Sequence, residues 1–426
     1  MSMFLPFSKF KKWSSSSSSI IAPLSNPLFK LLWIGNFLSN LGTMMHAIAA
    51  AWLMTSLTTS PWLIGLVQSA FSFPILLMGI PAGVFADLLD RRLLLIIAQC
   101  WMMFFVLLMS LLAVLGKMTP CSLLILLFLI GLGAALHFPT WLALLQDLVP
   151  PNHLSAAVSL NSIAFNLART MGPALGGLLV SILGAPMVFL ANGLSFIAIL
   201  LGLLRVPVKN RSILNTSQGI MNSFFQSFLE IAIFLIKSNV LLGATLRFAL
   251  FMMGGAGFLG LLPLLAKENF HLGASAFGEL MSLFGVGSVL GALLLPRLRS
   301  TYSMDTIIVI SSLIFSVILF FLTILKTIIM INALMVILGA TWILVIVNYN
   351  IAIQLSASEE LKGRAISIYV VIYQGGIALS SAWMGGVASH WGVASSLLLG
   401  GMTVILSLLL IPLLPLCSSS SSLRIE

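Results

Sequence analysis

Twelve runs of about 20 mostly apolar residues follow one another along this chain, and short breaks rich in charge, Gly or Pro separate them. A helix needs about 20 apolar residues to cross the hydrocarbon core of a bilayer. Only 7% of the residues are charged, against about 25% in a soluble domain. The pattern predicts an all-α integral membrane protein with 12 transmembrane helices. The spans are expected at 29–53, 62–86, 93–115, 121–145, 156–180, 186–205, 240–265, 275–296, 305–325, 328–352, 365–389 and 393–416.

Part of the pattern of the first half of the chain recurs in the second half at one constant offset. The recurring pairs are Gly79/Gly287, Gly83/Gly291, Arg91/Arg299, Gly131/Gly339, Ser159/Ser367 and Gly184/Gly392. Internal repeats in a long membrane chain are typical of secondary transporters. We therefore expect two six-helix halves, 29–205 and 240–416, with a cytoplasmic linker at 206–239. The Ser-rich segment 1–28 and the segment 417–426 are expected to be cytoplasmic tails.

The basic residues predict the orientation. One set of loops and tails carries 15 Lys and Arg, the opposite set carries three, and Arg169 and Arg247 fall inside spans. Lys and Arg concentrate in cytoplasmic loops, so both termini are expected in the cytoplasm. The net charge of +10 then follows from topology and indicates no nucleic-acid partner. The expected partners are the lipid bilayer, a small-molecule substrate and protons.

Several classes of site have no support in the sequence. Cys100, Cys121 and Cys417 have neither disulfide nor metal-ligand spacing. No Ser/His/Asp group, paired carboxylates or metal-spaced cluster stands out within the spans. We expect no enzyme activity, no metal and no cofactor.

The loop between the second and third spans carries a motif. It reads Gly-x-x-Ala-Asp-x-x-x-Arg-Arg-x-x-Leu and consists of Gly83, Ala86, Asp87, Arg91, Arg92 and Leu95. With six plus six helices and cytoplasmic termini, the chain resembles the major facilitator superfamily over roughly residues 28–416. Leu88 and Asp90 depart from the family form, which has a basic residue and a glycine at these positions.

A second motif lies in the fifth span, where Arg169 precedes Gly172-Pro173-Ala-Leu-Gly176-Gly177. It resembles the Gly-Pro-x-x-Gly-Gly element of antiporter-type members. The chain is most similar to the branch of enterobactin-exporter-like and macrolide-efflux-like proteins. This resemblance implies a monomer in a bacterial-type cytoplasmic membrane that couples export to protons. Leu127 stands where drug exporters of the superfamily often carry an Arg, so a proton-relay role of that Arg cannot be transferred.

The two motifs supply the candidate gating residues: Gly83, Asp87, Arg91, Arg92, Gly172 and Pro173. A charged contact at the cytoplasmic helix ends can hold two halves closed and release when they rock. The alternative for Arg91 and Arg92 is a topological anchor only. Pro173 removes one helical hydrogen bond, so Gly172-Pro173 is either a hinge or a packing notch.

Arg169 is the leading candidate for substrate contact, because it falls near the middle of its span. A charge at that depth costs at least about 2.5–3.5 kcal/mol and usually faces a cavity or a partner. Asn166 is expected on the same helix face. Arg247 lies two turns into the seventh span and could contact substrate or extend to the cytoplasm. The other candidates for the substrate cavity are Asn36, Asn40, Trp141, Tyr373 and Gln374; each could equally bond a neighbouring helix.

Titratable groups inside the spans are few. Glu279, His46 and His137 are the candidates for proton coupling. Histidine can exchange protons near neutral pH, but a single His in a helix is more often a packing residue. The sequence therefore points to no single coupling site.

The sequence favours a secondary active transporter that exports amphiphilic small molecules, such as drugs or siderophores, by alternating access. Few charges, several aromatics and 21 methionines suit a large, mostly apolar solute. Two alternatives stay open: a nutrient importer of the same fold, and a non-transporting sensor or scaffold derived from a transporter.

Overall fold

The computed structural model describes residues 20–207, 239–356 and 362–411, without the side chains at 80, 84, 87, 88, 239 and 362–364. Both predicted tails beyond these bounds, and the linker residues 208–238, lie outside the described residues. A short helical turn, Ala22–Ser25, precedes the first half. The helices of that half are α1 (Pro27–Leu57), α2 (Pro61–Leu88), α3 (Arg91–Val114), α4 (Pro120–Leu148), α5 (Pro151–Leu183) and α6 (Ala185–Leu203).

The second half contains six more spans. Its first span consists of α8 (Asn239–Gly255), α9 (Gly257–Leu264) and the π-helical turn η3 (Leu265–Asn269). It is followed by α10 (Ala274–Thr301), α11 (Met304–Ile324), α12 (Ile328–Leu355) and α13 (Lys362–Leu409). Non-helical backbone at Gly392 divides α13 into two spans. The described residues thus form the 12 expected spans, and the prediction of an all-α membrane protein is confirmed.

The helix ends follow from local sequence. Proline occupies the first turn of α1, α2, α4 and α5, where its missing N–H breaks no helical bond. Side chains of Asn26, Asp90, Thr119 and Ser303 cap the N-termini of α1, α3, α4 and α11. These caps satisfy backbone N–H groups that the helices leave unpaired. The loops between spans can therefore be very short.

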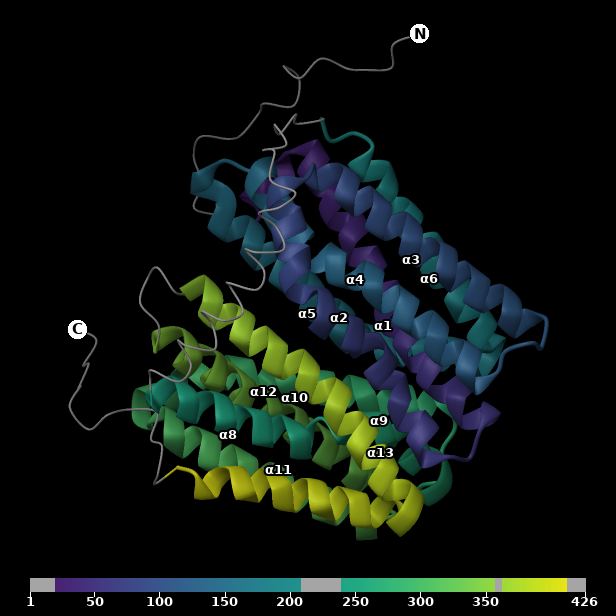
Figure 1. Ribbon diagram of the computed structural model, residues 1–426, viewed down its shortest axis with the longest axis vertical. Helices are drawn as coiled ribbons and strands as arrows, with labels where there is room; N and C mark the ends of the chain where they lie inside the picture. Colours follow the sequence, from purple (N-terminus) through teal and green to yellow (C-terminus); the bar gives the residue numbers. More distant parts are fainter. Residues whose placement is uncertain (1–19, 208–238, 357–361, 412–426) are drawn as a thin grey trace.

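The two halves lie one above the other in Figure 1, meet towards the right of the view and separate towards the left. We call the end at which the halves separate the basic end, because the α2–α3 connection with Arg91 and Arg92 and the α6 terminus with Arg205 belong to that end of the first half. The other side, with the α1–α2 and α9–α10 connections, is the opposite end. The cross-half packing is formed mainly by α2 with α13 and by α5 with α10.

Backbone contacts close the opposite end. A Cβ added to Gly278 of α10 would lie 2.4 Å from the carbonyl oxygen of Pro173 on α5. A Cβ added to Gly65 of α2 would lie 2.5 Å from the carbonyl oxygen of Ser381 on α13. Glycine permits such approach between helices. At the basic end, by contrast, a Cβ at Gly79 or Gly83 would meet nothing within 4 Å.

These contacts also test the repeat. Pro173 and Ser381 are related by the offset found in the sequence, as are Gly184 and Gly392, which both adopt positive φ of 81° and 82°. The residues on α2 and α10 that contact Ser381 and Pro173 are not related by this offset. Gly65 corresponds to Gly278, and the cap Asp90 corresponds to Ser303; the offset of these two pairs is larger by five.

The repeat offset predicted from the sequence is therefore wrong for the second and eighth spans. Gly79 and Gly83 are not the structural counterparts of Gly287 and Gly291, and Arg91 corresponds to Met304 rather than to Arg299. The reason is an insertion: α3 and α4 begin at residues 91 and 120, whereas α11 and α12 begin at 304 and 328. The extra residues lie in α3 and the loop after it.

Candidate functional site

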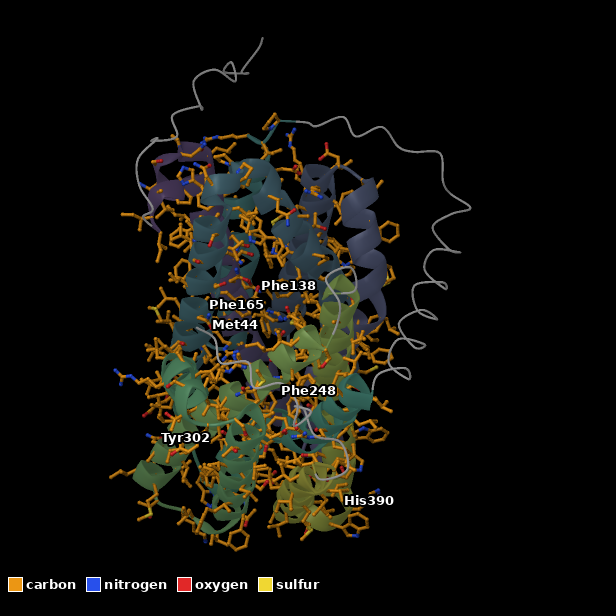
Figure 2. The ribbon with its side chains drawn as sticks, turned by 90° about the vertical axis from the view of Figure 1, so that its left-hand side faces the viewer. Met44, Phe138, Phe165, Phe248, Tyr302 and His390 are labelled. Atoms are coloured by element: carbon orange, nitrogen blue, oxygen red, sulfur yellow. The ribbon has the colours of Figure 1, made fainter. Side chains whose placement is uncertain are left out.

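A cavity of about 670 Å³ lies between the two halves. Its wall comes from both halves, including α1, α2, α4 and α5 on one side and α10, α12 and α13 on the other. Figure 2 shows Met44, Phe138 and Phe165, three of the lining residues, close together at the level where the halves meet. Cavities of about 300–1,000 Å³ suit small-molecule ligands.

The wall is mostly apolar and aromatic. Its aromatic residues are Phe71, Phe138, Phe165, Phe277, Phe284, Trp342 and Tyr373. The backbone contacts described above close it at the opposite end, and Trp52 of α1 stacks on Phe277 of α10 with ring centroids 6.0 Å apart. The cavity therefore opens towards the basic end, where a Cβ at the lining residue Gly79 would meet nothing within 4 Å.

Polar groups on this wall are few: Thr43, His46, Gln68, Ser72, Arg169, Asn192, Ser367 and Gln374, with the Tyr373 phenol. The structure thus places four of the predicted site residues on one cavity, namely Arg169, Tyr373, Gln374 and His46. Pro173 of the second motif also lines it.

Arg169 lies near the middle of α5 and is half-buried. Among the described residues, its guanidinium has no hydrogen-bond or ion-pair partner. The side chain is thus available to a ligand from the open side of the cavity.

His46 lies on α1 and is 3% exposed. Its ring packs on Phe189 with centroids 4.8 Å apart. Neither ring nitrogen has a hydrogen-bond partner among the described residues. Buried polar groups are usually paired, so this cavity-lining imidazole is available for a ligand or a proton.

The other two candidates for coupling lie elsewhere. His137 is buried inside the first half, where its Nδ1 lies 2.9 Å from Gln99 Nε2 and its ring stacks on Trp141. Glu279 is exposed on α10 and accepts a hydrogen bond of 2.9 Å from Asn332 of α12. Neither residue lines the cavity.

Asn36 and Trp141 belong to a separate polar cluster near the basic end. Asn161 of α5 accepts hydrogen bonds from Trp141 Nε1 at 2.7 Å and from Asn36 Nδ2 at 3.3 Å. This cluster joins α1, α4 and α5 but does not line the cavity. Asn40 is half-buried off the cavity wall.

Asn166 does not share the cavity face of Arg169. It is exposed and donates to the Ser162 carbonyl of its own helix at 2.8 Å. A spacing of three residues turns a helix by about 300°, which is enough to carry Asn166 off the wall while Phe165, four residues from Arg169, remains on it.

Arg247 lies inside the second half, away from the cavity wall. Its side chain is fully buried and pairs with Asp305 of α11 at 2.6 Å. Its guanidinium carbon also lies 5.8 Å from the ring centroid of Tyr349. The alternative of extension to solvent is therefore not adopted, because Asp305 supplies a counter-charge within the bundle.

The basic pair of the first motif binds within the first half. Arg91 pairs with Asp147 at 2.9 Å and donates to the carbonyls of Ala86 and Ala143. Arg92 donates to the carbonyls of Leu203 and Leu204 at the end of α6, each at 3.0 Å. The side chain of Asp87 lies outside the described residues.

Gly172 and Pro173 lie where α5 contacts two neighbours. A Cβ on Gly172 would lie 2.4 Å from Met44 Cβ of α1, and the Pro173 carbonyl abuts Gly278 of α10. Sequence reasoning missed the cavity residues Gln68 and Asn192 and the bonding residue Asn161. Each is a polar residue inside an apolar span, which is the signal that could have found them.

Comparison with known proteins matches the whole bundle. The family described as transmembrane secretion effector matches residues 18–424. The staphyloferrin A transporter of Staphylococcus aureus is 24% identical over 88% of this chain and 93% of its own length. The enterobactin exporter EntS of Shigella boydii is 26% identical over 68% of each chain.

Solved structures show the same fold. A bacterial homologue of the human lysosomal transporter Spinster, in an inward-facing and occupied conformation, has a TM-score of 0.72 at 13% identity. That match covers 92% of this chain and 97% of the other. A D-xylose–proton symporter has a TM-score of 0.68 at 14% identity over 90% and 96%.

Proposed function

Because this chain belongs to the transmembrane secretion effector family of major facilitator transporters, we propose that it exports amphiphilic, siderophore-like small molecules from the cytoplasm by alternating access. It is a multi-pass membrane transporter and not an enzyme. The observation that carries the proposal is the apolar cavity between the halves, closed at the opposite end and open at the basic end. The two relatives named for siderophores support the substrate class.

The basic end is the cytoplasmic end in this proposal. Arg91, Arg92, Arg205 and Arg297 lie there, and Lys and Arg concentrate on the cytoplasmic side of membrane proteins. The conformation is then inward-facing, with both termini in the cytoplasm. Export begins when a molecule enters from that side, and ends when the contacts of the opposite end separate while the basic end closes.

The gating residues act at the ends of this motion. Arg91 and Arg92 hydrogen-bond the α2–α3 connection to α4 and α6. The end of α2 that carries Gly83 and Asp87 therefore moves together with the rest of the first half. Gly83 faces open space and can admit the second half when the basic end closes. Gly172 and Pro173 lie on α5 where it packs against α1 and α10, and the Pro173–Gly278 contact is one of those that separate when the opposite end opens.

Proton coupling is assigned to His46. Of the three candidates, it alone lines the cavity. Both of its ring nitrogens lack a hydrogen-bond partner among the described residues, so the imidazole can take up and release a proton at the cavity wall. Proton entry with substrate exit gives antiport.

The test is transport by everted membrane vesicles in which the cytoplasmic face is outside. Vesicles containing the protein should accumulate an amphiphilic fluorophore faster than vesicles without it, and a protonophore should abolish the difference. His46→Gln should leave passive exchange but lose the response to the pH gradient. No accumulation of anionic, neutral or cationic amphiphiles would contradict the exporter and favour the importer or the scaffold. Accumulation that ignores the protonophore would contradict proton coupling alone.

A further inference from the structure

The cavity carries one charge on its described wall, the guanidinium of Arg169. We propose that the transported molecule carries an anionic group, which Arg169 binds, next to an aromatic or aliphatic body. This rests on the proposed function and adds the charge class of its substrate. Arg169 is then the residue that selects anionic over neutral and cationic amphiphiles.

The first argument is the unpaired state of Arg169. Its guanidinium has no acceptor among the described residues, whereas the fully buried Arg247 has Asp305 at 2.6 Å. The chain thus supplies a counter-charge to the arginine inside the second half and leaves the one in the cavity without one. Guanidinium offers a planar set of donors that fits a carboxylate, sulfonate or phosphate through two parallel hydrogen bonds.

The second argument is the charge of the whole wall. Within the described part of the chain, no Asp or Glu side chain lines the cavity. A cationic amphiphile would meet a positive charge and no carboxylate, in an apolar setting that strengthens the repulsion. An anionic one would meet Arg169 and the neutral donors Gln374 and Tyr373. The wall therefore discriminates by sign.

The third argument comes from the repeat. Arg169 and Ile377 lie at corresponding positions of α5 and α13, related by the same offset as Pro173 and Ser381, and both line the cavity. Phe165 and Tyr373 correspond in the same way. The walls match in aromatic character, but only that of the first half carries a charge. An amphiphile fits this arrangement with its anionic group at α5 and its apolar body against Phe277, Phe284 and Trp342.

The fourth argument is the closing of the cavity. While it is open at the basic end, water can solvate Arg169. Occlusion removes that water, and an unpaired charge in an apolar membrane interior is costly. A bound anion replaces the lost solvation, so the loaded cavity closes more readily than the empty one. The same charge thus couples recognition to the conformational change.

The experiment is equilibrium binding to the purified protein in nanodiscs, with empty nanodiscs subtracted. Two probes differ in charge but share one aromatic scaffold: anionic 8-anilinonaphthalene-1-sulfonate and uncharged N-phenyl-1-naphthylamine. Arg169→Gln should weaken binding of the sulfonate about tenfold to a hundredfold, the range for a lost hydrogen bond to a charged group. It should change binding of the uncharged probe by less than about twofold, and Arg169→Lys should restore part of the loss.

Arg297→Gln is the matched control, because it removes the same charge from an exposed position at the basic end; it should leave both probes unaffected. Equal effects of Arg169→Gln on the two probes, no effect, or no saturable binding of the sulfonate would overturn the proposal. Vesicle transport separates this failure from failure of the exporter. Transport of neutral or cationic amphiphiles that is indifferent to Arg169→Gln keeps the exporter and removes the anion selectivity, whereas no transport of any amphiphile removes the exporter.

Discussion

Gly177→Ala should shift the transporter away from the conformation described here. Gly177 lies on α5 near the opposite end, where the two halves touch. A Cβ at this position would lie 2.5 Å from the carbonyl oxygen of Ala274 and 2.8 Å from the Cα of Gly278, both on α10. These neighbours are backbone atoms, so no side-chain rotation can remove the overlap, and α5 and α10 must move apart.

The magnitude follows from the contact distances. Ordinary van der Waals contact begins near 3.4 Å, so α10 must retreat by about 0.9 Å from its 2.5 Å position. Overpacking of this kind costs about 1–3 kcal/mol. The conformation with the opposite end open lacks the contact and is spared this cost. The ratio of the two conformations should therefore change by about 5-fold to 150-fold in favour of the outward-open one.

Distances between spin labels measure this shift. Ser155 of α5 and Ser300 of α10 are exposed at the basic end, and cysteines at these two positions can be labelled in a background that lacks the three native cysteines. In the parent protein the long distance should dominate. Gly177→Ala should raise the population of the short distance, because the basic end closes when the opposite end opens.

Gly386→Ala serves as the control, because it also adds a methyl group within a helix but its Cβ meets nothing within 4 Å. It should leave the distance distribution unchanged. An unchanged distribution in folded Gly177→Ala protein would refute the reasoning that this contact limits opening. Equal shifts in both variants would point to helix propensity rather than to the contact.

Two further substitutions test the residues away from the cavity. Trp141→Phe should lower stability by about 1 kcal/mol, the usual value of one hydrogen bond, because Asn161 loses its 2.7 Å donor; transport should persist, and a loss of transport at full expression would place Trp141 in the substrate path after all. Asp305→Ala should destabilise the second half by about 3 kcal/mol, measured as a lower thermal midpoint, since it deprives buried Arg247 of its ion-pair partner. The double variant Arg247→Met/Asp305→Leu should recover much of that loss, and an equal midpoint for both variants would contradict the assignment.

The spans were predictable because the bilayer imposes them. Twenty apolar residues must be helical to satisfy their backbone groups, and Pro or a capping side chain marks the ends. The expected first span, 29–53, and the observed α1, Pro27–Leu57, differ only where apolar residues run past the membrane interface. The repeat was predictable in kind, but its register was wrong in the second and eighth spans, because it was fitted to single matching residues and not to the lengths of the third and ninth spans and the loops that follow them.

The place of the charged residue in the site could be predicted from the sequence, but the places of the neutral polar residues could not. Arg169 could be found from the sequence, since a midplane guanidinium must face water or a ligand. Asn36, Asn166 and Trp141 could not be placed, because a neutral amide or indole can be satisfied by a neighbouring helix, by its own backbone or by a ligand at similar cost. Only packing decides among these, as Asn161 does for Asn36 and Trp141.

The two halves of this transporter thus share their packing contacts but differ in the charge that they present to the cavity. Closure of the opposite end is made twice in the same way, by the Pro173 carbonyl against Gly278 and by the Ser381 carbonyl against Gly65. Since these contacts lie at corresponding positions in the two halves and close the same end, we expect both to separate when that end opens. Charge breaks the symmetry: Arg169 faces the cavity from one half and Ile377 from the other. We therefore expect an anionic ligand bound to Arg169 to stay with α5 during the conformational change. The α13 wall would then move relative to the bound ligand.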